Sequence, residues 1–423
     1  MPDVTIINGR LITLAGPDGP RRGEAMSELA EIESGWIAIE DGRIHGMGEG
    51  SPPQDMDSDV VLDLDGRLVL PTWVDCHTHA CWAGSRLDEW EAMLSGVNYT
   101  EILEAGGGIL STVHAVRAAS QDELTESLFG RLGRLQSCGT GAIEVKSGYG
   151  LTTESELKML RAIHEASQDV DTQVVGTFLG AHAIDDEQPD FIDYVIEEVL
   201  PTVTDEFPGI TCDAYLEEGA WSLAQTRRLF EQARSLGCPL RLHTDQFNSL
   251  GGVPMAVELG ARSVDHLEAI TEADIRTLGG SETLGVLLPA SGFHVDQRYA
   301  PGRDLIDGGA AIAIATNCNP GSAPTYSMPM TMALACRRCG LSPAEAITAA
   351  TWNAACVLGI EGDVGSLEVG KRGDLQVLDE RDARSIVWSF GNPPPPIVLL
   401  EGRPVQFLAE SDSAGEGEGE GDG

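Results

Sequence analysis

Residues 68–79 read Leu-Val-Leu-Pro-Thr-Trp-Val-Asp-Cys-His-Thr-His. The apolar run at the start of this stretch predicts a buried strand, and side chains two apart on a strand point the same way. His77 and His79 therefore direct both imidazoles toward one place at the end of the strand. Neutral imidazole is the commonest protein ligand for zinc and also suits iron. The stretch predicts a metal site, the alternative being two unrelated surface histidines.

Further apolar runs follow along the chain, and helix-like segments separate them. Together with residues 68–74, we interpret as strands the runs 141–145, 173–181, 210–216, 239–242, 261–267, 283–289 and 310–315. Strands that alternate with helices in this way over about 250–300 residues favour an α/β fold of the (β/α)8 TIM-barrel type. Shorter β-rich segments with Asn-Gly and Asp-Gly turns occupy both ends of the chain.

The chain is strongly acidic, because 67 Asp and Glu residues face 27 Lys and Arg residues in 423 residues. A net charge of −40 predicts repulsion from nucleic acid and from anionic membranes. We read the scarcity of lysine as a hypothesis about a high-salt habitat. We expect no membrane span and no secretory leader. The nine cysteines have no regular spacing, which favours free thiols and a cytoplasmic protein.

Polar residues gather where the predicted strands end, which is where active sites lie in this barrel fold. Five of the nine histidines fall at such ends, and this concentration indicates a site built from imidazoles. In strand order the residues are His77 and His79, then Lys146 to Tyr149, His182, Glu217 and Glu218, His243 and Gln246, Asp265 and His266, and finally Asn317 and Asn319.

Longer strings give the chain a family resemblance. It resembles the amidohydrolase superfamily and, within it, the imidazolonepropionases. The superfamily pattern is H-x-H on the first strand, single histidines on the fifth and sixth, and an aspartate after the eighth. The closer match rests on Ala105-Gly-Gly-Gly-Ile-Leu-Ser-Thr-Val113, Glu144-Val-Lys-Ser-Gly-Tyr-Gly-Leu151, Thr177-Phe-Leu-Gly-Ala-His182, Ser249-Leu-Gly-Gly252 and Asn319-Pro-Gly-Ser322.

The resemblance implies a division of the chain and an activity. Residues 1–67 and 366–409 would form a small β-sandwich domain, residues 68–365 the barrel, and residues 410–423 a disordered acidic tail. The implied reaction is hydrolytic opening of 4-imidazolone-5-propanoate to N-formimidoyl-L-glutamate in histidine degradation. It implies one zinc or iron ion and a small-molecule substrate, and we expect a homodimer.

The resemblance also implies roles for single residues. His77, His79 and His243 match the metal ligands, and Asn317 occupies the place of the superfamily's aspartate. A guanidinium binds a carboxylate through two parallel hydrogen bonds, which suits Arg86 to the propanoate arm. The remaining substrate-contacting positions of the family correspond to Tyr149, His182, Asn319, Gly321 and Ser322. Tyr149 and His182 are also candidates to orient the ring or to carry the proton that reaches the ring nitrogen.

Three positions leave alternatives open. Gln246 cannot carry a proton at neutral pH, so we expect it to orient the ring, and His266 is the best remaining titratable group unless it is a core histidine tied to Asp265. Lys146 could be a carbamylated ligand between two metals, although the family string has this lysine without that chemistry. A neutral Asn317 puts the fourth ligand and the usual base in doubt. The chain could therefore be a related amidohydrolase acting on another cyclic amide or amidine, or a catalytically weak binding protein.

Overall fold

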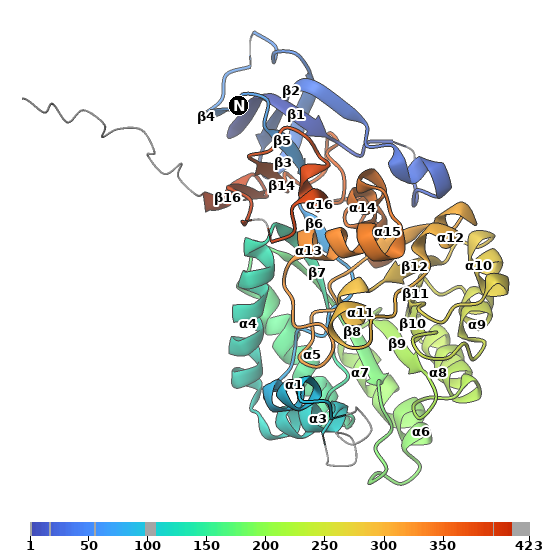
Figure 1. The fold of residues 1–423 in the computed structure, drawn as a ribbon. Coiled ribbons are helices and arrows are strands. Elements are labelled where there is room, and N and C mark those ends of the chain that lie inside the picture. Colours follow the sequence, from blue (N-terminus) through green and yellow to red (C-terminus); the bar gives the residue numbers. More distant parts are fainter. Residues whose placement is uncertain (1, 17, 55, 98–106, 392, 408–423) are drawn as a thin grey trace, which may run out of the picture.

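The computed structural model describes residues 2–16, 18–54, 56–97, 107–391 and 393–407. Its larger part is an eight-stranded parallel sheet in which strands adjacent in sequence are also neighbours in space (Figure 1). The strands are β6 (Trp73–Asp75), β7 (Thr140–Lys146), β8 (Gln173–Ala181), β9 (Thr211–Leu216), β10 (Leu240–Thr244), β11 (Ser263–His266), β12 (Leu284–Leu287) and β13 (Ile312–Ile314). The predicted (β/α)8 barrel is confirmed, and each apolar run supplies one of its strands.

Hydrogen bonds just beyond the strands join the first strand of this sheet to the last. The backbone N–H of Asn317 donates to the His77 carbonyl oxygen at 3.0 Å, and that of His79 donates to the Cys318 carbonyl oxygen at 3.0 Å. These bonds close the barrel on the side where the strands end. They also place the segment after β13 directly beside the two histidines that follow β6.

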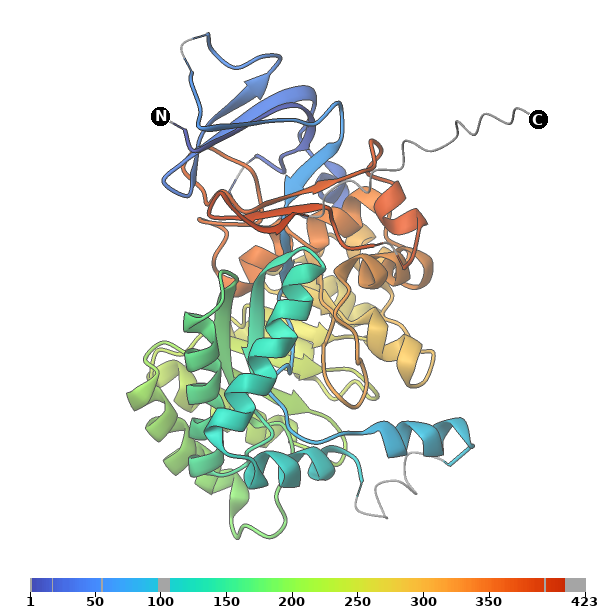
Figure 2. The same ribbon diagram turned by 90° about the vertical axis from the view of Figure 1, so that its left-hand side faces the viewer.

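Segments from both ends of the chain build a second, separate sheet (Figure 2). Its order is β16, β15, β14, β5, β1, β2 and β3, with β4 paired to β1. The bounds are β1 (Val4–Ile12), β2 (Glu31–Glu40), β3 (Arg43–Glu49), β4 (Val60–Asp63), β5 (Leu68–Pro71), β14 (Leu375–Leu378), β15 (Ile397–Leu400) and β16 (Arg403–Phe407). The expected small β domain from both chain ends is thus present, while its boundaries at residues 67 and 366 stay predictions. The predicted tail, residues 410–423, lies outside the described residues.

The apolar run at residues 68–74 contributes to both sheets. β5 pairs with β14 in the second sheet, whereas β6 pairs with β7 in the barrel. Pro71, at the end of β5, has no backbone N–H to donate to a sheet, and Thr72 separates the two strands. The first barrel strand is therefore shorter than predicted, and the chain just before the two histidines is fixed to the smaller domain.

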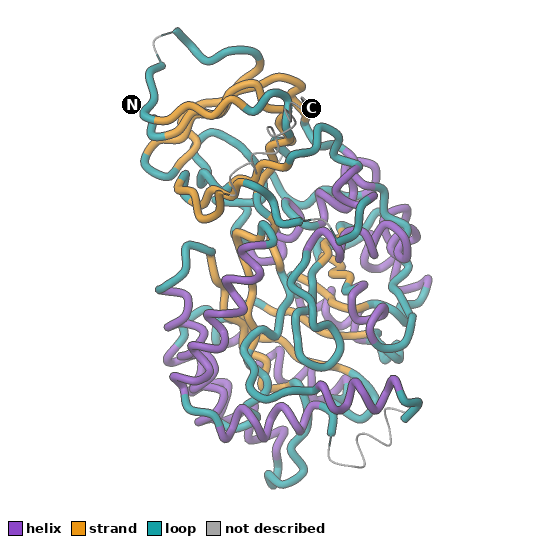
Figure 3. Tube along the Cα trace, turned by 60° about the vertical axis from the view of Figure 1, so that its left-hand side comes forward, coloured by secondary structure: helices purple, strands orange, loops and turns teal. Residues whose placement is uncertain are grey.

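Helices cover the outside of the barrel (Figure 3). Among the described residues, no helix is long and apolar enough to cross a membrane. The nine cysteines are all free, as predicted. The helices are η1 (Gly23–Ser27), α1 (Leu87–Leu94), α3 (Ile109–Ala118), α4 (Gln121–Ser137), α5 (Thr153–Gln168), α6 (Phe191–Tyr194), η2 (Val195–Val199), α7 (Leu200–Glu206), α8 (Leu223–Ser235), α9 (Gly252–Leu259), α10 (Glu272–Gly279), α11 (Pro289–His294), α12 (Gly302–Asp307), α13 (Met328–Leu334), η3 (Ala335–Cys339), α14 (Pro343–Ala349), α15 (Trp352–Leu358) and α16 (Ser385–Trp388).

The barrel closure yields a stability prediction. The buried Asp75 carboxylate accepts hydrogen bonds from the Thr316 N–H at 3.0 Å and from the Thr316 hydroxyl at 2.5 Å. Thr316→Val removes only the hydroxyl, and a buried acceptor that loses its partner costs about 1–3 kcal/mol. We expect the free energy of unfolding, measured by urea denaturation, to fall by that amount. Thr316→Ser keeps the hydroxyl and should stay closer to the native value, and equal stabilities of the two variants would contradict the assignment.

Candidate metal and substrate site

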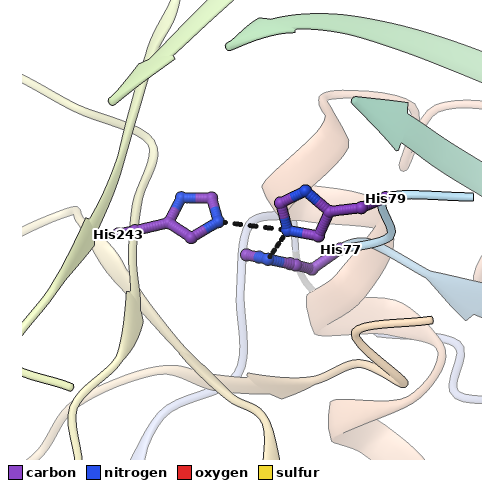
Figure 4. Close-up of side chains that lie close together, drawn as sticks. All are labelled: His77, His79 and His243. Atoms are coloured by element: carbon purple, nitrogen blue, oxygen red, sulfur yellow. Dashed lines mark hydrogen bonds between the residues drawn. The ribbon is translucent and has the colours of Figure 1, made fainter. Parts of the chain in front are cut away.

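Three buried histidines meet where β6 and β10 end (Figure 4). His77 Nε2 lies 3.3 Å from His79 Nε2, and His243 Nε2 lies 3.4 Å from His79 Nε2. One nitrogen from each ring falls within 4.8 Å of the other two. The structure thus brings together the three histidines that the sequence predicts as metal ligands.

Buried carboxylates hold two of these rings from behind. His77 Nδ1 lies 2.6 Å from an Asp265 oxygen, and His243 Nδ1 lies 3.1 Å from an Asp213 oxygen. A carboxylate accepts, so each Nδ1 carries the proton and each Nε2 is left with a lone pair. This is how metal-binding histidines are commonly oriented.

All three imidazoles are held neutral. Burial, followed by the Lys146 ammonium, lowers the pKa of His77 well below its usual range. Burial, followed by the His182 ring, does the same to the pKa of His79. Burial also lowers the pKa of His243, although Asp213 opposes this effect. Neutral imidazole is the form that binds metals.

The short nitrogen contacts fit a cation better than a hydrogen-bonded cluster. His79 Nε2 contacts both other rings, but it has at most one proton to donate. At least one of the two contacts at 3.3 and 3.4 Å therefore brings two lone pairs together. A metal ion at the meeting point of the three Nε2 atoms would turn that repulsion into coordination. The donor set fits one metal ion held by three imidazoles.

Beneath the histidines, five charged side chains form one buried network. Lys146 Nζ lies 2.8 Å from both Glu144 and Asp213. Arg241 lies 2.5 Å from both Glu144 and Asp265. Lys146 is therefore an ammonium ion paired with two carboxylates. This pairing argues against a carbamylated Lys146 between two metals, because a carbamate would carry the wrong charge for both partners.

Asn317 stands beside the cluster with its oxygen unused. Its Nδ2 donates to Ser291 Oγ at 2.7 Å, whereas its Oδ1 is buried and has no hydrogen-bond partner among the described residues. The amide is thus held by its nitrogen. A buried unpartnered oxygen at this position is suited to a metal ion or a substrate donor.

Arg86 lies against the loop that follows β13. Its Nη2 pairs with Glu89 at 2.6 Å, and its buried Nε has no hydrogen-bond partner among the described residues. A Cβ on Gly321 would come within 2.9 Å of Arg86 Nη1, so only glycine lets the guanidinium lie this close. Asn319 Oδ1 accepts from the N–H groups of Gly321 at 2.8 Å and Ser322 at 2.7 Å. The Asn319 amide therefore shapes the loop from within.

Tyr149 and His182 line the other side of the cluster. The His182 ring stacks on His79 with centroids 4.9 Å apart, and Tyr149 lies 5.2 Å from His182. His182 Nδ1 donates to the Gly148 carbonyl oxygen at 3.1 Å, which leaves Nε2 as an acceptor. Burial, followed by the nearby His243 ring, lowers the pKa of His182 to about 3. His182 is thus a neutral acceptor and a poor acid at neutral pH.

His266 and Gln246 complete the group. The His266 ring lies 5.6 Å from the His243 ring, and its Nδ1 lies 3.4 Å from a Glu268 oxygen. The alternative that Asp265 ties His266 into the core is wrong, because Asp265 contacts His77 instead. Gln246 Oε1 accepts from the Tyr215 hydroxyl at 2.9 Å.

Sequence reasoning missed four residues that contact the predicted site residues. They are Asp213 behind His243, Glu268 behind His266, Ser291 behind Asn317 and Tyr215 beside Gln246. Asp213 could have been found, because a charged residue inside an otherwise apolar strand must face a partner. The other three lie in loops, a helix or a strand end, where no periodicity marks them. Ala105 and Gly106 of the first family string lie outside the described residues.

Sequence comparison defines the class of the protein. The sequence model of the Amidohydrolase family matches residues 68–406, and the chain belongs to that family. Its fold is similar to that of 5-methylcytosine deaminase from Klebsiella pneumoniae, with a TM-score of 0.74 and 16% identity over 97% of this chain and 99% of that one.

The chain is also similar to individual curated proteins. The chain is 45% identical to the imidazolonepropionase of Herpetosiphon aurantiacus, over 94% of this chain and 96% of that protein. It is 41% identical to the imidazolonepropionase of Chloroflexus aggregans, again over 94% of this chain and 96% of that protein. The chain therefore matches relatives of this name over nearly their whole length.

The cluster predicts a specific loss of metal. His243→Ala removes one of three imidazole ligands and leaves the Asp213 carboxylate without its ring partner. We expect the purified variant to contain little or no bound metal while its far-ultraviolet circular dichroism stays native. His114→Ala, on the exposed face of α3, is the matched control and should keep the native metal content. Native metal stoichiometry in His243→Ala, measured by elemental analysis, would contradict the ligand assignment.

Proposed function

We propose that the protein hydrolyses 4-imidazolone-5-propanoate to N-formimidoyl-L-glutamate. The observation that carries the proposal is the convergence of three neutral imidazole nitrogens on one point at the mouth of the barrel. The similarity to imidazolonepropionases over 94% of the chain supports the substrate. Arg86, set against the loop after β13, suits a substrate with a carboxylate arm.

We assign the metal site to His77, His79 and His243, with Asn317 Oδ1 as a neutral fourth donor. Imidazole and amide donors suit zinc or iron, and one ion satisfies the cluster. When bound, such an ion acts as a Lewis acid and lowers the pKa of water from 15.7 to about 7. The chain's own residues then have to place the ring carbonyl and move a proton from the water to the ring nitrogen.

The residues proposed to contact the substrate have different roles. Arg86 Nε–H, which has no hydrogen-bond partner in the described part of the chain, can donate to the propanoate arm beside the loop of Asn319, Gly321 and Ser322. His182 Nε2 accepts a hydrogen bond from the ring and, being neutral, orients it rather than protonating it. Tyr149, packed on His182, limits how the ring can tilt.

His266 is the residue that moves protons in this proposal. With Nδ1 turned to Glu268, its Nε2 is left to take a proton from the attacking water. Glu268 would stabilise the imidazolium that results. The same nitrogen then returns the proton to the ring nitrogen as the cyclic amide bond breaks. Gln246 contributes only a hydrogen bond, because an amide side chain cannot take up or release a proton at neutral pH.

Two finer points accompany the proposal. The nine free cysteines support a cytoplasmic location, because reduced thiols persist in reducing compartments. A homodimer stays our expectation, and light scattering on the purified protein tests it. Hydrolysis of imidazolonepropanoate by metal-loaded protein, measured with its metal content on the same sample, is the direct test of the function.

Arg86→Lys tests the carboxylate contact. Lysine keeps the positive charge but lacks the planar guanidinium group that donates two parallel hydrogen bonds. Losing a charge-assisted hydrogen bond costs about 1.5–3 kcal/mol, or about 10–100-fold in affinity. We expect the Michaelis constant for the propanoate substrate to rise by this factor. Arg276→Lys, an exposed arginine on α10, should leave it unchanged. A native Michaelis constant in Arg86→Lys would exclude Arg86 as the clamp.

Asn317→Asp separates an active enzyme from a weak binding homologue. An anionic ligand in place of a neutral one should tighten metal binding by about tenfold or more. The exposed Gln168→Glu adds the same charge away from the site and should not change metal affinity. We expect the metal-loaded native protein to turn over substrate. Turnover that appears only in Asn317→Asp would show that the native chain is the binding homologue.

A further inference from the structure

A fully buried carboxylate holds the loop that carries Tyr149. Glu156 stands in the first turn of α5, and its side chain contacts the backbone between β7 and α5. Its Oε2 accepts from the Gly148 N–H at 3.0 Å. Its Oε1 accepts from the N–H groups of Gly150 at 2.8 Å and Leu151 at 2.9 Å. A backbone N–H can only donate, so the direction of all three hydrogen bonds is fixed.

The loop has a backbone conformation that needs this support. Gly148 has a φ of 103° and Leu151 a φ of 54°, and a positive φ is unfavourable for a leucine. A chain keeps such a conformation only where its surroundings fix it. A Cβ on Gly150 would lie 2.5 Å from the backbone nitrogen of Glu156, so the loop lies directly against the helix. The glycine at this position lets the backbone reach the Glu156 carboxylate.

Gly148 connects Glu156 to the candidate metal site. Its N–H donates to Glu156, and its carbonyl oxygen accepts from His182 Nδ1 at 3.1 Å. Because a carbonyl oxygen can only accept, Nδ1 carries the proton of the neutral imidazole and Nε2 is left with the lone pair. The His182 ring stacks on His79 with centroids 4.9 Å apart. The contacts that start at Glu156 therefore end beside the three clustered histidines.

The two oxygens of Glu156 serve different parts of the loop. Oε1 accepts from Gly150 and Leu151, and Arg117 Nε also holds the Gly150 carbonyl oxygen at 2.8 Å. Oε2 accepts from Gly148, the residue whose carbonyl oxygen faces His182. The part of the loop that fixes the imidazole thus depends on Oε2.

We infer that Glu156 is a positioning residue that acts through Gly148 on His182. It holds the Gly148 carbonyl oxygen against Nδ1, which fixes the tautomer of the imidazole and leaves Nε2 as an acceptor for the substrate ring. The inference rests on the proposed function, in which His182 orients that ring. Glu156 itself contacts the backbone of the loop and not the reacting atoms.

Glu156→Gln keeps the size of the side chain and replaces one carboxylate oxygen with an amide donor. The remaining oxygen keeps the N–H groups of Gly150 and Leu151, so the new amide nitrogen faces the Gly148 N–H and that hydrogen bond is lost. We expect kcat/KM for imidazolonepropanoate to fall about three- to tenfold, the range for one hydrogen bond, with native metal content. In a His182→Ala background the same substitution should change kcat/KM by less than about twofold, because no imidazole is left to position.

Glu345→Gln is the matched control. Glu345 is also a buried carboxylate in the first turn of a helix, α14, and its Oε2 accepts from the Ser342 N–H at 2.7 Å. Both variants should lower the melting temperature, but Glu345→Gln should keep the native kcat/KM. Glu156→Asp keeps the charge and draws the carboxylate back by one methylene. It takes the place of Glu156→Gln should that variant fail to fold, and it should lower kcat/KM in the same way.

The tautomer of His182 gives a readout that does not need turnover. Nitrogen-15 NMR of zinc-loaded protein labelled in its histidines distinguishes a protonated ring nitrogen from an unprotonated one, and the His182 signals are those lost in His182→Ala. The native protein should show Nδ1 protonated. In Glu156→Gln the tautomer ratio should move about three- to tenfold toward a protonated Nε2. A loss of stability alone, as in Glu345→Gln, should not change this ratio.

The outcomes separate the inference from the proposed function. Native turnover of imidazolonepropanoate together with an unchanged His182 tautomer in Glu156→Gln would overturn the inference alone. Equal losses of kcat/KM in the native and His182→Ala backgrounds would also overturn it, because they would mark Glu156 as merely structural. Absence of turnover in the native protein would overturn the proposed function, and the tautomer ratio would still decide whether Glu156 positions His182.

Discussion

Five charged side chains lie buried inside the barrel, and none of them can be left unpaired. A buried charge without a partner costs several kcal/mol, so each must face an opposite charge or a strong donor. Lys146 and Arg241 share Glu144, and their other sides pair with Asp213 and Asp265. Three carboxylates against two cations leave one excess negative charge. The two outer carboxylates lie against His77 and His243, so the ion pairs that compensate the buried charges also orient two of the three clustered imidazoles.

The buried carboxylates also bear on the absence of charge at Asn317. The three clustered imidazoles and the Asn317 amide carry no charge, so they would leave the full charge of a bound cation uncompensated. The carboxylates of Asp213 and Asp265 stand one atom layer further out, on the Nδ1 sides of His243 and His77. Their hydrogen bonds raise the basicity of Nε2 in both rings. A cation bound by the cluster would thus meet negative charge behind two of the rings, although neither the three imidazoles nor the Asn317 amide is charged.

The structural features that depend on a single segment of the chain could be predicted from the sequence. Apolar runs located all the barrel strands, and the two-residue period located His77 and His79 on one side of their strand. It did not predict that residues 68–74 enter two sheets, because that depends on which strands lie beside them. It also could not predict that Asp265 contacts His77 or that Tyr215 contacts Gln246, since both contacts join residues from different strands or loops. Pairing between segments is a property of the closed barrel.

The site therefore has two parts with different physical origins. The three clustered histidines and the charges behind them stand on strands or at their ends, in a packed interior where a shift of one side chain would unpair a charge. Arg86, Gln246 and the loop of Asn319 stand on connections outside the strands, where the chain can vary without opening the core. A family can therefore keep one way of activating water and change the molecule that is hydrolysed. In this chain the Tyr215 hydroxyl, on strand β9, donates to Oε1 of Gln246, so at least one of the loop side chains is held by the packed interior.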